Sequence, residues 1–213
     1  MASLYLNTDM KEDKKYTLDN DTYASTPGEV SFNPLVWIKH RPLVPATSAL
    51  GLLAIFMAYG ITSKISLMFL ISLIGYAGYS WVKIKEHYTA DSNGGIIVSK
   101  NPTLVAVSTD TSKGNGYYPA IKIIRYTPKR PVRVGDKIGT VSVYEDNYEY
   151  KDYWSNFYPL PIDYATDNIH EIRNEIERYP QEQWEDIKYG LSQIPKPYKP
   201  GYYRINTEDA DWD

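Results

Sequence analysis

The sequence predicts an α+β protein in which a two-helix transmembrane hairpin precedes a small antiparallel β-sheet, or partly closed barrel, packed with two C-terminal helices. Three observations favour this fold class. Residues 42–82 form an apolar run whose only charged residue is Lys64. Several short segments rich in Val, Ile, Thr and Tyr follow this run, and two segments with helical periodicity come last.

The composition divides the chain into parts of different character. Residues 1–31 form a polar N-terminal arm, 32–87 an interfacial segment and the hairpin, 88–205 a soluble α+β domain, and 206–213 an acidic tail. The 213 residues include no Cys and carry a net charge of -3. Disulfides and thiolate chemistry are therefore excluded, and nothing in the charge indicates a nucleic-acid partner.

The apolar run is long enough for two membrane helices. One helix needs about 20 mostly apolar residues, because a rise of about 1.5 Å per residue must cover about 30 Å of hydrocarbon. Polar residues 62–64 divide the run, so we expect helices over about residues 42–60 and 65–83. Small residues, among them Gly51, Gly75 and Gly78, would let the two helices approach closely. A buried core hairpin of a soluble protein fits less well, because both halves are apolar on all faces.

Aromatic and basic residues flank the hairpin on both sides. The expected membrane-interface anchors are Trp37, Lys39, Arg41, Trp81, Lys83 and Lys85. Since the turn holds only Lys64, the positive-inside rule predicts a two-pass protein of the bacterial inner (cytoplasmic) membrane with both termini in the cytoplasm. Membrane lipid is thus one expected partner. Neither helix has an internal ionisable residue, which argues against a transport pathway.

Short strands dominate the first half of the soluble domain. We expect residues 89–95 to be a polar linker or turn, and residues 96–99, 103–109 and 118–127 to be strands. Val132 and Val134, then Gly135-Asp136, then further apolar residues up to 143 predict two strands about a Gly-Asp turn. Frequent Gly and Pro between such short strands indicate a strongly bent sheet or a partly closed barrel.

Two helices are predicted in the second half. Asn168, with Glu171 three residues on, fits a capping box, and isoleucines at helical spacing follow it. Pro180 ends that helix and can begin the next, whose apolar stripe starts at Trp184. Both stripes favour packing on the sheet. Residues 201–205 are expected to form a short extended strap.

No residue set predicts catalysis, a cofactor or a metal site. His170-Glu171 lies on a predicted helix, but Asn174 stands where a zinc protease needs its second His. The acidic residues between 145 and 152 lack the spacing of a calcium loop. With only three His, two of them beside the hairpin, a Ser-His-Asp enzyme is implausible. We therefore predict that the protein is not an enzyme.

An aromatic belt mixed with acidic residues is the most suggestive local feature. Its candidate partner-binding residues are Tyr144, Tyr148, Tyr150, Tyr153 and Trp154. Aromatic side chains with a polar atom are favoured at protein interfaces. In the alternative interpretation, Trp154 packs against the helices and only Tyr148 and Tyr150 are exposed.

The order and spacing of several motifs resemble one bacterial family. The motifs are V-x-V-G-D-x-I-x-x-V-x-V-Y at 132–144, W-x-x-F-x-P-x-P-I at 154–162 with Thr166-Asp167 after it, and Y-P-Q-E-Q-W at 179–184. Over roughly residues 101–205 the chain resembles the uncharacterised membrane-protein family of domain of unknown function 3239. The resemblance implies a membrane hairpin followed by this domain and brings no activity. The chain departs from it at 163–165, where Asp-Tyr-Ala replaces an expected Trp-Gly pair.

These observations favour a membrane-anchored cytoplasmic scaffold domain that docks another protein. The sequence does not specify the identity of this partner. Two alternatives stay open. One is an immunity or accessory protein against a secreted or membrane-active toxin, which a small acidic membrane protein would suit. The other is a barrel that binds a lipid or another small ligand, for which a large apolar pocket would be the structural sign.

Overall fold

The computed structural model describes residues 28–114, 116–146 and 152–206. Most of the polar arm and the acidic tail from residue 207 lie outside them. The elements are α1 (Pro34–His40), α2 (Leu43–Tyr59), α3 (Lys64–His87), β1 (Asp91–Lys100), β2 (Thr103–Asp110), β3 (Pro119–Arg125), β4 (Lys137–Glu145), β5 (Asn156–Pro161), the 3-10 turn η3 (Ile162–Tyr164), α4 (Ile169–Arg178), α5 (Gln181–Ser192) and β6 (Gly201–Arg204).

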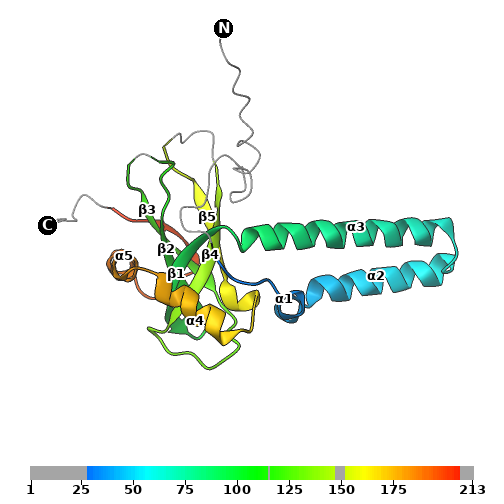
Figure 1. The fold of residues 1–213 in the computed structure, drawn as a ribbon, viewed down its shortest axis with the longest axis horizontal. Coiled ribbons are helices and arrows are strands. Elements are labelled where there is room, and N and C mark those ends of the chain that lie inside the picture. The colour runs from blue at the N-terminus through cyan, green and yellow to red at the C-terminus, as the bar shows by residue number, and fades with distance from the viewer. Residues whose placement is uncertain (1–27, 115, 147–151, 207–213) are drawn as a thin grey trace, which may run out of the picture.

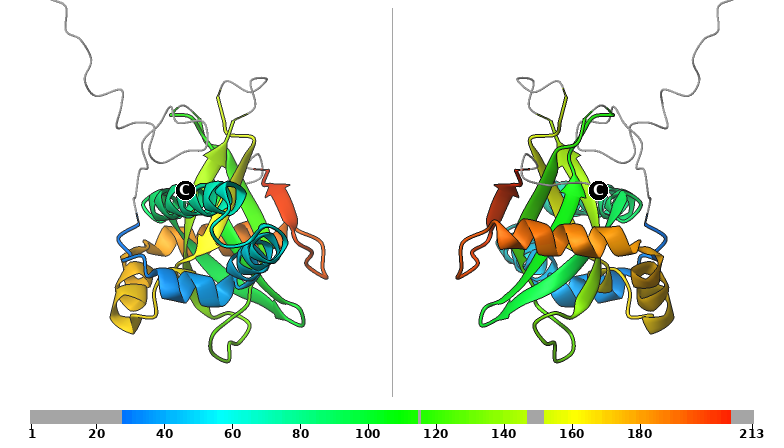
Figure 2. Two further views of the ribbon diagram at one scale, coloured as in Figure 1. Left: turned by 90° about the vertical axis from the view of Figure 1, so that its right-hand side faces the viewer. Right: turned by 90° about the vertical axis from the view of Figure 1, so that its left-hand side faces the viewer.

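The six strands form one antiparallel sheet in the order β5-β4-β1-β2-β3-β6. The sheet curls into a half-barrel, and α4 and α5 lie against its outer face (Figure 2). The α+β class with a bent sheet and two C-terminal helices is thereby confirmed. The expected strap is β6, which pairs with β3 at the edge of the sheet.

Alternation along the strands gives the sheet an apolar core on each face. On β2, Leu104 and Ala106 belong to the cluster packed under α5, together with Ile121, Trp184 and Ile187. The residues between them, Val105 and Val107, belong to the cluster on the concave face. A strand buried on both faces in this way is a continuous apolar run, as the sequence of β2 is.

The expected linker at 89–95 is wrong, because β1 begins at Asp91 and pairs with β4 from Asp91 onward. The glycines that suggested a turn are required by close packing instead. A Cβ at Gly94 would lie 2.8 Å from ring atoms of Trp184, and one at Gly95 would lie 2.9 Å from Val105. Only glycine lets α5 and the sheet approach this closely.

Of the two strands expected about Gly135-Asp136, only the second forms, as β4. Residues 132–134 are not a strand, and Val134 is 61% exposed. Instead, the amide of Arg133 donates to the Asp136 carboxylate over 2.7 Å, and Gly135 adopts a φ of 95°. The chain turns here before β4, since this hydrogen bond holds the segment in a loop.

The C-terminal helices begin and end close to the predicted positions. Asn168 caps α4 by accepting from the amide of His170 over 3.1 Å, and Pro180 is the N-cap of α5. Glu171 does not complete the capping box in the usual way. It accepts from the Asn168 side chain and from the amide of Ser31, so it ties the N-terminal segment to the helix.

The hairpin extends from the domain as a long rod (Figure 1), and α2 packs against α3. By length and composition α3 is the one helix of the described residues that could cross a membrane, while α2, with 17 residues, is shorter. In the turn, Ser63 caps α3 and the Ser66 hydroxyl donates to the Gly60 carbonyl over 2.7 Å.

Two details of the hairpin differ from expectation. Gly75 and Gly78 have no atom within 4 Å of an added Cβ, so they do not mediate close helix packing in this chain. Helix α3 also continues past residue 83, because its last turn packs on the domain through Ile84 and the adjoining Tyr88.

Candidate functional site

An aromatic cluster joins the hairpin to the domain. The ring of Phe32 lies 5.5 Å from that of Trp81 and 5.9 Å from that of Tyr88, and Trp37 lies 6.0 Å from Tyr88. Tyr88 is fully buried and donates its hydroxyl to the Pro161 carbonyl over 3.2 Å. Aromatic pairs at these distances stabilise beyond their area alone, so the base of the hairpin is fixed to the sheet.

The predicted membrane-interface residues gather at this base. Trp37 and Trp81 both contact Phe32, and the Arg41 guanidinium lies 5.5 Å from the centre of the Trp37 ring. Lys83 pairs with Glu86 over 3.2 Å on the surface. The remaining two, Lys39 and Lys85, are exposed. Such aromatic and cationic side chains suit a lipid headgroup region.

Lys129 is a further cation near this base, next to His40, and the sequence analysis did not identify it. His40 stacks on Tyr164 with 4.1 Å between ring centres. Burial lowers the pKa of His40, and the nearby ammonium of Lys129 lowers it further. Lys129 belongs to the loop between β3 and β4, far from α1 in sequence, so only the fold brings it here.

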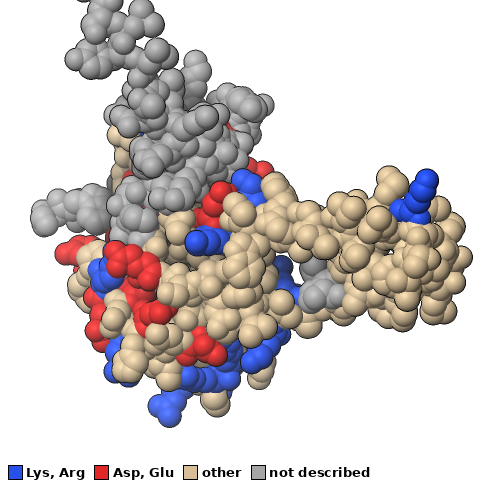
Figure 3. All heavy atoms as spheres, turned by 45° about the vertical axis from the view of Figure 1, so that its right-hand side comes forward, with Lys and Arg blue, Asp and Glu red and all other residues tan. Residues whose placement is uncertain are grey.

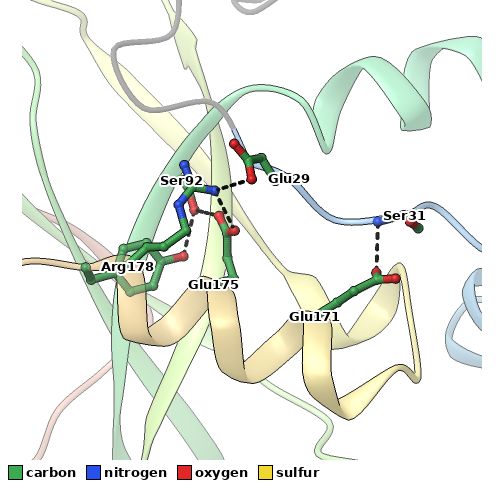
Figure 4. Close-up of polar contacts among 7 residues, drawn as sticks. Glu29, Ser31, Ser92, Glu171, Glu175 and Arg178 are labelled. Atoms are coloured by element: carbon green, nitrogen blue, oxygen red, sulfur yellow. Dashed lines mark hydrogen bonds and ion pairs between the residues drawn. The ribbon is translucent and has the colours of Figure 1, made fainter.

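A polar cluster clamps the N-terminal segment onto α4 (Figure 4). Arg178 pairs with Glu29 over 3.2 Å and with Glu175 over 3.1 Å. The Ser92 hydroxyl donates to the Glu175 carboxylate and lies 2.7 Å from the Tyr179 hydroxyl. Ser92 and Glu175 are almost fully buried and line none of the three cavities described below. This arrangement suits a structural clamp, since a substrate would not reach it.

The aromatic belt divides between core and surface. Tyr144 and Trp154 are only 5% and 4% exposed, and they pack together on the concave face of the sheet, not against the helices. Tyr148 and Tyr150 lie outside the described residues. Tyr153 is half-buried, with its ring 4.8 Å from Tyr118 and 4.1 Å from the Arg204 guanidinium. Of the described candidates, Tyr153 therefore offers the most accessible ring.

Three cavities differ in chemistry. An open groove of about 680 Å³ is mostly apolar and is lined by residues such as Val98, Leu104 and Tyr198. A cavity of about 180 Å³ lies between η3, α4 and the β3–β4 loop, with Lys129 and Asp163 in its lining. A third, of about 110 Å³, lies between α5 and the ends of β2 and β3, and its lining is rich in hydrogen-bond acceptors.

The third cavity has a distinct electrostatic character. Burial raises the pKa of Asp186, and the neighbouring Glu185 and Glu182 raise it further. Burial also raises the pKa of Tyr117 to about 12, with Asp186 and Asp110 adding to the effect. Both shifts mean that an added negative charge is disfavoured in this cavity.

Fold and site together define an α+β protein with a curled antiparallel sheet, a helix long enough to cross a membrane and an aromatic joint between the two. The chain belongs to the family described as protein of unknown function (DUF3239), whose model matches residues 81–195. The family resemblance of its motifs is thus confirmed. The match runs from the last turns of α3 to the residues after α5.

A solved structure from Corynebacterium diphtheriae, described as a "putative membrane protein", is also similar. It shares 22% sequence identity with the chain, covers 54% of it and all of its own length, and superposes with a TM-score of 0.46. No curated protein matches the chain.

Proposed function

We propose that the protein is a membrane-anchored docking domain without catalytic activity. The α2–α3 hairpin crosses the bacterial inner membrane twice, and the domain holds a protein partner at the cytoplasmic surface. The observation that carries the proposal is the surface of the hairpin. Its exposed side chains include Leu53, Met57, Met68, Ile71 and Ile74, each more than half exposed. Apolar side chains exposed on all sides suit a lipid environment and not water.

The lengths of the two helices are compatible with a double crossing. At about 1.5 Å per residue, the 17 residues of α2 span about 26 Å and the 24 residues of α3 about 36 Å. A shorter helix is accommodated by local thinning of the bilayer, at a modest cost. The last turn of α3 belongs to the joint with the domain, so the two lengths within the membrane become similar.

The charges support the orientation. In Figure 3 basic atoms lie near the far end of the visible face of the hairpin, where Lys64 lies, and acidic atoms of this face are seen only towards the base, where Glu86 pairs with Lys83. The predicted anchors place Lys39, Arg41, Lys83 and Lys85 at the base. An excess of cations at the base favours a cytoplasmic domain.

Labelling of single cysteines tests the topology, because the natural chain contains none. Thr62→Cys, in the turn, should react with a membrane-impermeant maleimide in intact cells. Asp167→Cys, on the exposed surface of the domain, should react only after permeabilisation. If both positions react in intact cells, or if neither does until the cells are opened, the two-pass orientation is wrong.

Copurification tests the docking role. The full-length chain, tagged and extracted in mild detergent, should retain a specific partner that Tyr153→Ala weakens without unfolding the domain. Tyr158→Ala is a matched control, because Tyr158 is an exposed tyrosine on the outer side of β5. Equal retention of the partner by both variants would remove Tyr153 from the docking surface. A partner that copurifies with neither variant nor parent would contradict the docking role itself.

A further inference from the structure

Helix α1 exposes apolar and basic side chains beside the base of the hairpin. Val36 is buried where α1 contacts η3, whereas Leu35 and Ile38 are 69% and 44% exposed. Lys39, in the last turn of α1, and Arg41, which follows the helix, are exposed as well. A surface of this composition suits the boundary between lipid headgroups and acyl chains, because apolar side chains can enter the apolar layer while cations meet phosphate.

The start of the loop between β3 and β4 lies beside α1, because both contact the short segment that follows β5. His40 of α1 stacks on Tyr164 with 4.1 Å between ring centres. The Thr127 amide of the loop donates to the hydroxyl of the same tyrosine over 2.9 Å, and Lys129 donates to the Thr166 carbonyl over 3.4 Å. The fold therefore brings this loop to α1, although the two are far apart in the sequence.

Within the described residues, cations from α1 and from the loop lie close together and form no ion pairs. Burial lowers the pKa of Lys129, and the charges of Lys39 and Arg130 lower it further. Asp163 and Asp167 act in the opposite direction, but neither forms an ion pair with these cations in the part of the chain described. Lys129 and Arg130 are exposed, so both can meet an external anion.

These side chains lie on the side of the domain from which the hairpin extends. Seen along the hairpin from its far end (Figure 2, left), α1 lies across the front of the domain. Figure 3 shows basic atoms gathered along the lower edge of the domain, below the base of the hairpin. With α2 and α3 in a bilayer, as proposed, this side meets the cytoplasmic leaflet, whose anionic lipids give it a negative surface potential.

We propose that this surface of the domain binds the headgroups of anionic phospholipids in the cytoplasmic leaflet. We call it the cationic face, and it consists of Leu35, Ile38, Lys39, Arg41, Lys129 and Arg130. Its ammonium and guanidinium groups donate charge-assisted hydrogen bonds to phosphate oxygens, while the two aliphatic side chains enter the apolar boundary. The loop cations thereby extend the membrane contact from the hairpin to the soluble domain. The inference rests on the proposed membrane anchoring but not on the proposed protein partner.

Energy transfer to labelled lipids tests the proposal with the full-length protein in vesicles of phosphatidylcholine and phosphatidylglycerol. A donor fluorophore is attached at Pro131→Cys, in the loop, since the natural chain has no Cys. Transfer to phosphatidylglycerol with an acceptor on its acyl chain should exceed transfer to equally labelled phosphatidylcholine, and high salt should reduce the difference. A donor at Glu185→Cys, on α5 at the end of the domain away from the hairpin (Figure 1), should show no difference. Equal transfer to both lipids from position 131 would overturn the proposal.

A pair of charge reversals assigns the lipid preference to the loop. Arg130→Glu should lower the ratio of transfer to phosphatidylglycerol over phosphatidylcholine at least about twofold, because a cation at the anionic surface becomes an anion. It spares Lys129, which also donates to a backbone carbonyl. Lys188→Glu makes the same change of net charge on the exposed side of α5 and should leave the ratio unchanged. Circular dichroism establishes that both variants fold. Equal ratios in the two variants would overturn the assignment.

Flotation of the vesicles on a density gradient separates this inference from the anchoring on which it rests. The protein and both charge variants should float with the vesicles, because the hairpin is unchanged. Protein that floats but shows no preference for phosphatidylglycerol at position 131 would overturn the cationic face alone. Protein that does not float would overturn the proposed membrane anchoring as well.

Discussion

The hairpin and the domain use the same aliphatic residues in opposite ways. Met68 and Ile71 of α3 are 69% and 61% exposed, whereas Ile97, Ile121 and Ile187 of the domain are at most 1% exposed. In water the first arrangement would be unfavourable, because about 25 cal/mol is lost for each Å² of apolar surface left in contact with solvent. This difference is expected if the hairpin lies in a bilayer, as proposed, and the domain lies in water. The following predictions test this contrast, beginning with the largest expected effect.

A core deletion should separate the two regions most clearly. Ile187→Ala should reduce the free energy of unfolding of the domain by about 2–5 kcal/mol, because the cavity left beneath α5 has no group to fill it. Met68→Ala, on the exposed surface of α3, should change it by less than about 0.5 kcal/mol. Chemical denaturation of the protein in micelles, followed by near-UV circular dichroism, measures both. Similar losses in the two variants would contradict the contrast.

The clamp of Figure 4 gives the second prediction. Glu175→Ala should destabilise the domain by about 2–3 kcal/mol, because the buried Ser92 hydroxyl, which also contacts the Tyr179 hydroxyl, loses the carboxylate to which it donates. The loss falls below the 3–5 kcal/mol (roughly) of a fully buried pair, since Arg178 still reaches water. Glu177→Ala, an exposed change on the same helix, serves as the control in the same denaturation experiment. An equal effect of both changes would show that only helix propensity or surface charge matters.

Replacement of a glycine by alanine should lower the stability in the domain and leave it unchanged in the hairpin. Gly94→Ala should destabilise by about 1–3 kcal/mol, because its methyl group would lie 2.8 Å from Trp184. Gly75→Ala meets no atom within 4 Å and should leave the stability of the domain unchanged. The melting temperature of each variant measures the difference. Tolerance of alanine at position 94 would mean that α5 is free to shift away from the sheet.

The smallest expected effect concerns pH. Burial raises the pKa of Asp163, although hydrogen bonding from Tyr126 and the nearby Lys129 act against this. A carboxyl group whose pKa is higher in the folded state contributes stability below its unfolded pKa of about 3.9. This contribution is lost as the pH rises through the raised value. Asp163→Asn should therefore flatten the dependence of stability on pH in this acid range, by less than about 1 kcal/mol in total. Urea denaturation between pH 3.5 and 6.5 (approximately) checks it, and a slope unchanged by the substitution would contradict it.

The sequence predicted those parts of the fold that have a clear local periodicity. The strand at Thr103 and the helix capped by Asn168 follow from patterns of neighbouring residues. Gly94 led to the wrong prediction of a turn, because a glycine required by close packing with Trp184, ninety residues later, looks the same in the sequence as a turn glycine. Val134 led to the wrong prediction of a strand, because a valine in a loop looks the same in the sequence as a valine in a strand. Local patterns carry no information on such distant contacts.

The candidate sites were harder to predict for the same reason. Tyr144 and Trp154 stood out by composition, yet the curvature of the sheet buries them. Asn93 and Gln183 are unremarkable in the sequence, and only the fold brings these two residues to the lining of one cavity. The one sequence signal that pointed near this cavity was the abundance of tyrosine, and it gave no position.

The uninterrupted passage from α3 through Tyr88 to β1 has a mechanical consequence. Three residues separate the end of the helix from the central strand of the sheet, and the first of them is buried on all sides. With α3 in a bilayer, as proposed, no swivel exists between anchor and domain. A change in the tilt of the helix therefore rotates the whole half-barrel by the same angle. The thickness of the surrounding membrane, which sets that tilt, therefore sets the direction in which the domain faces the cytoplasm.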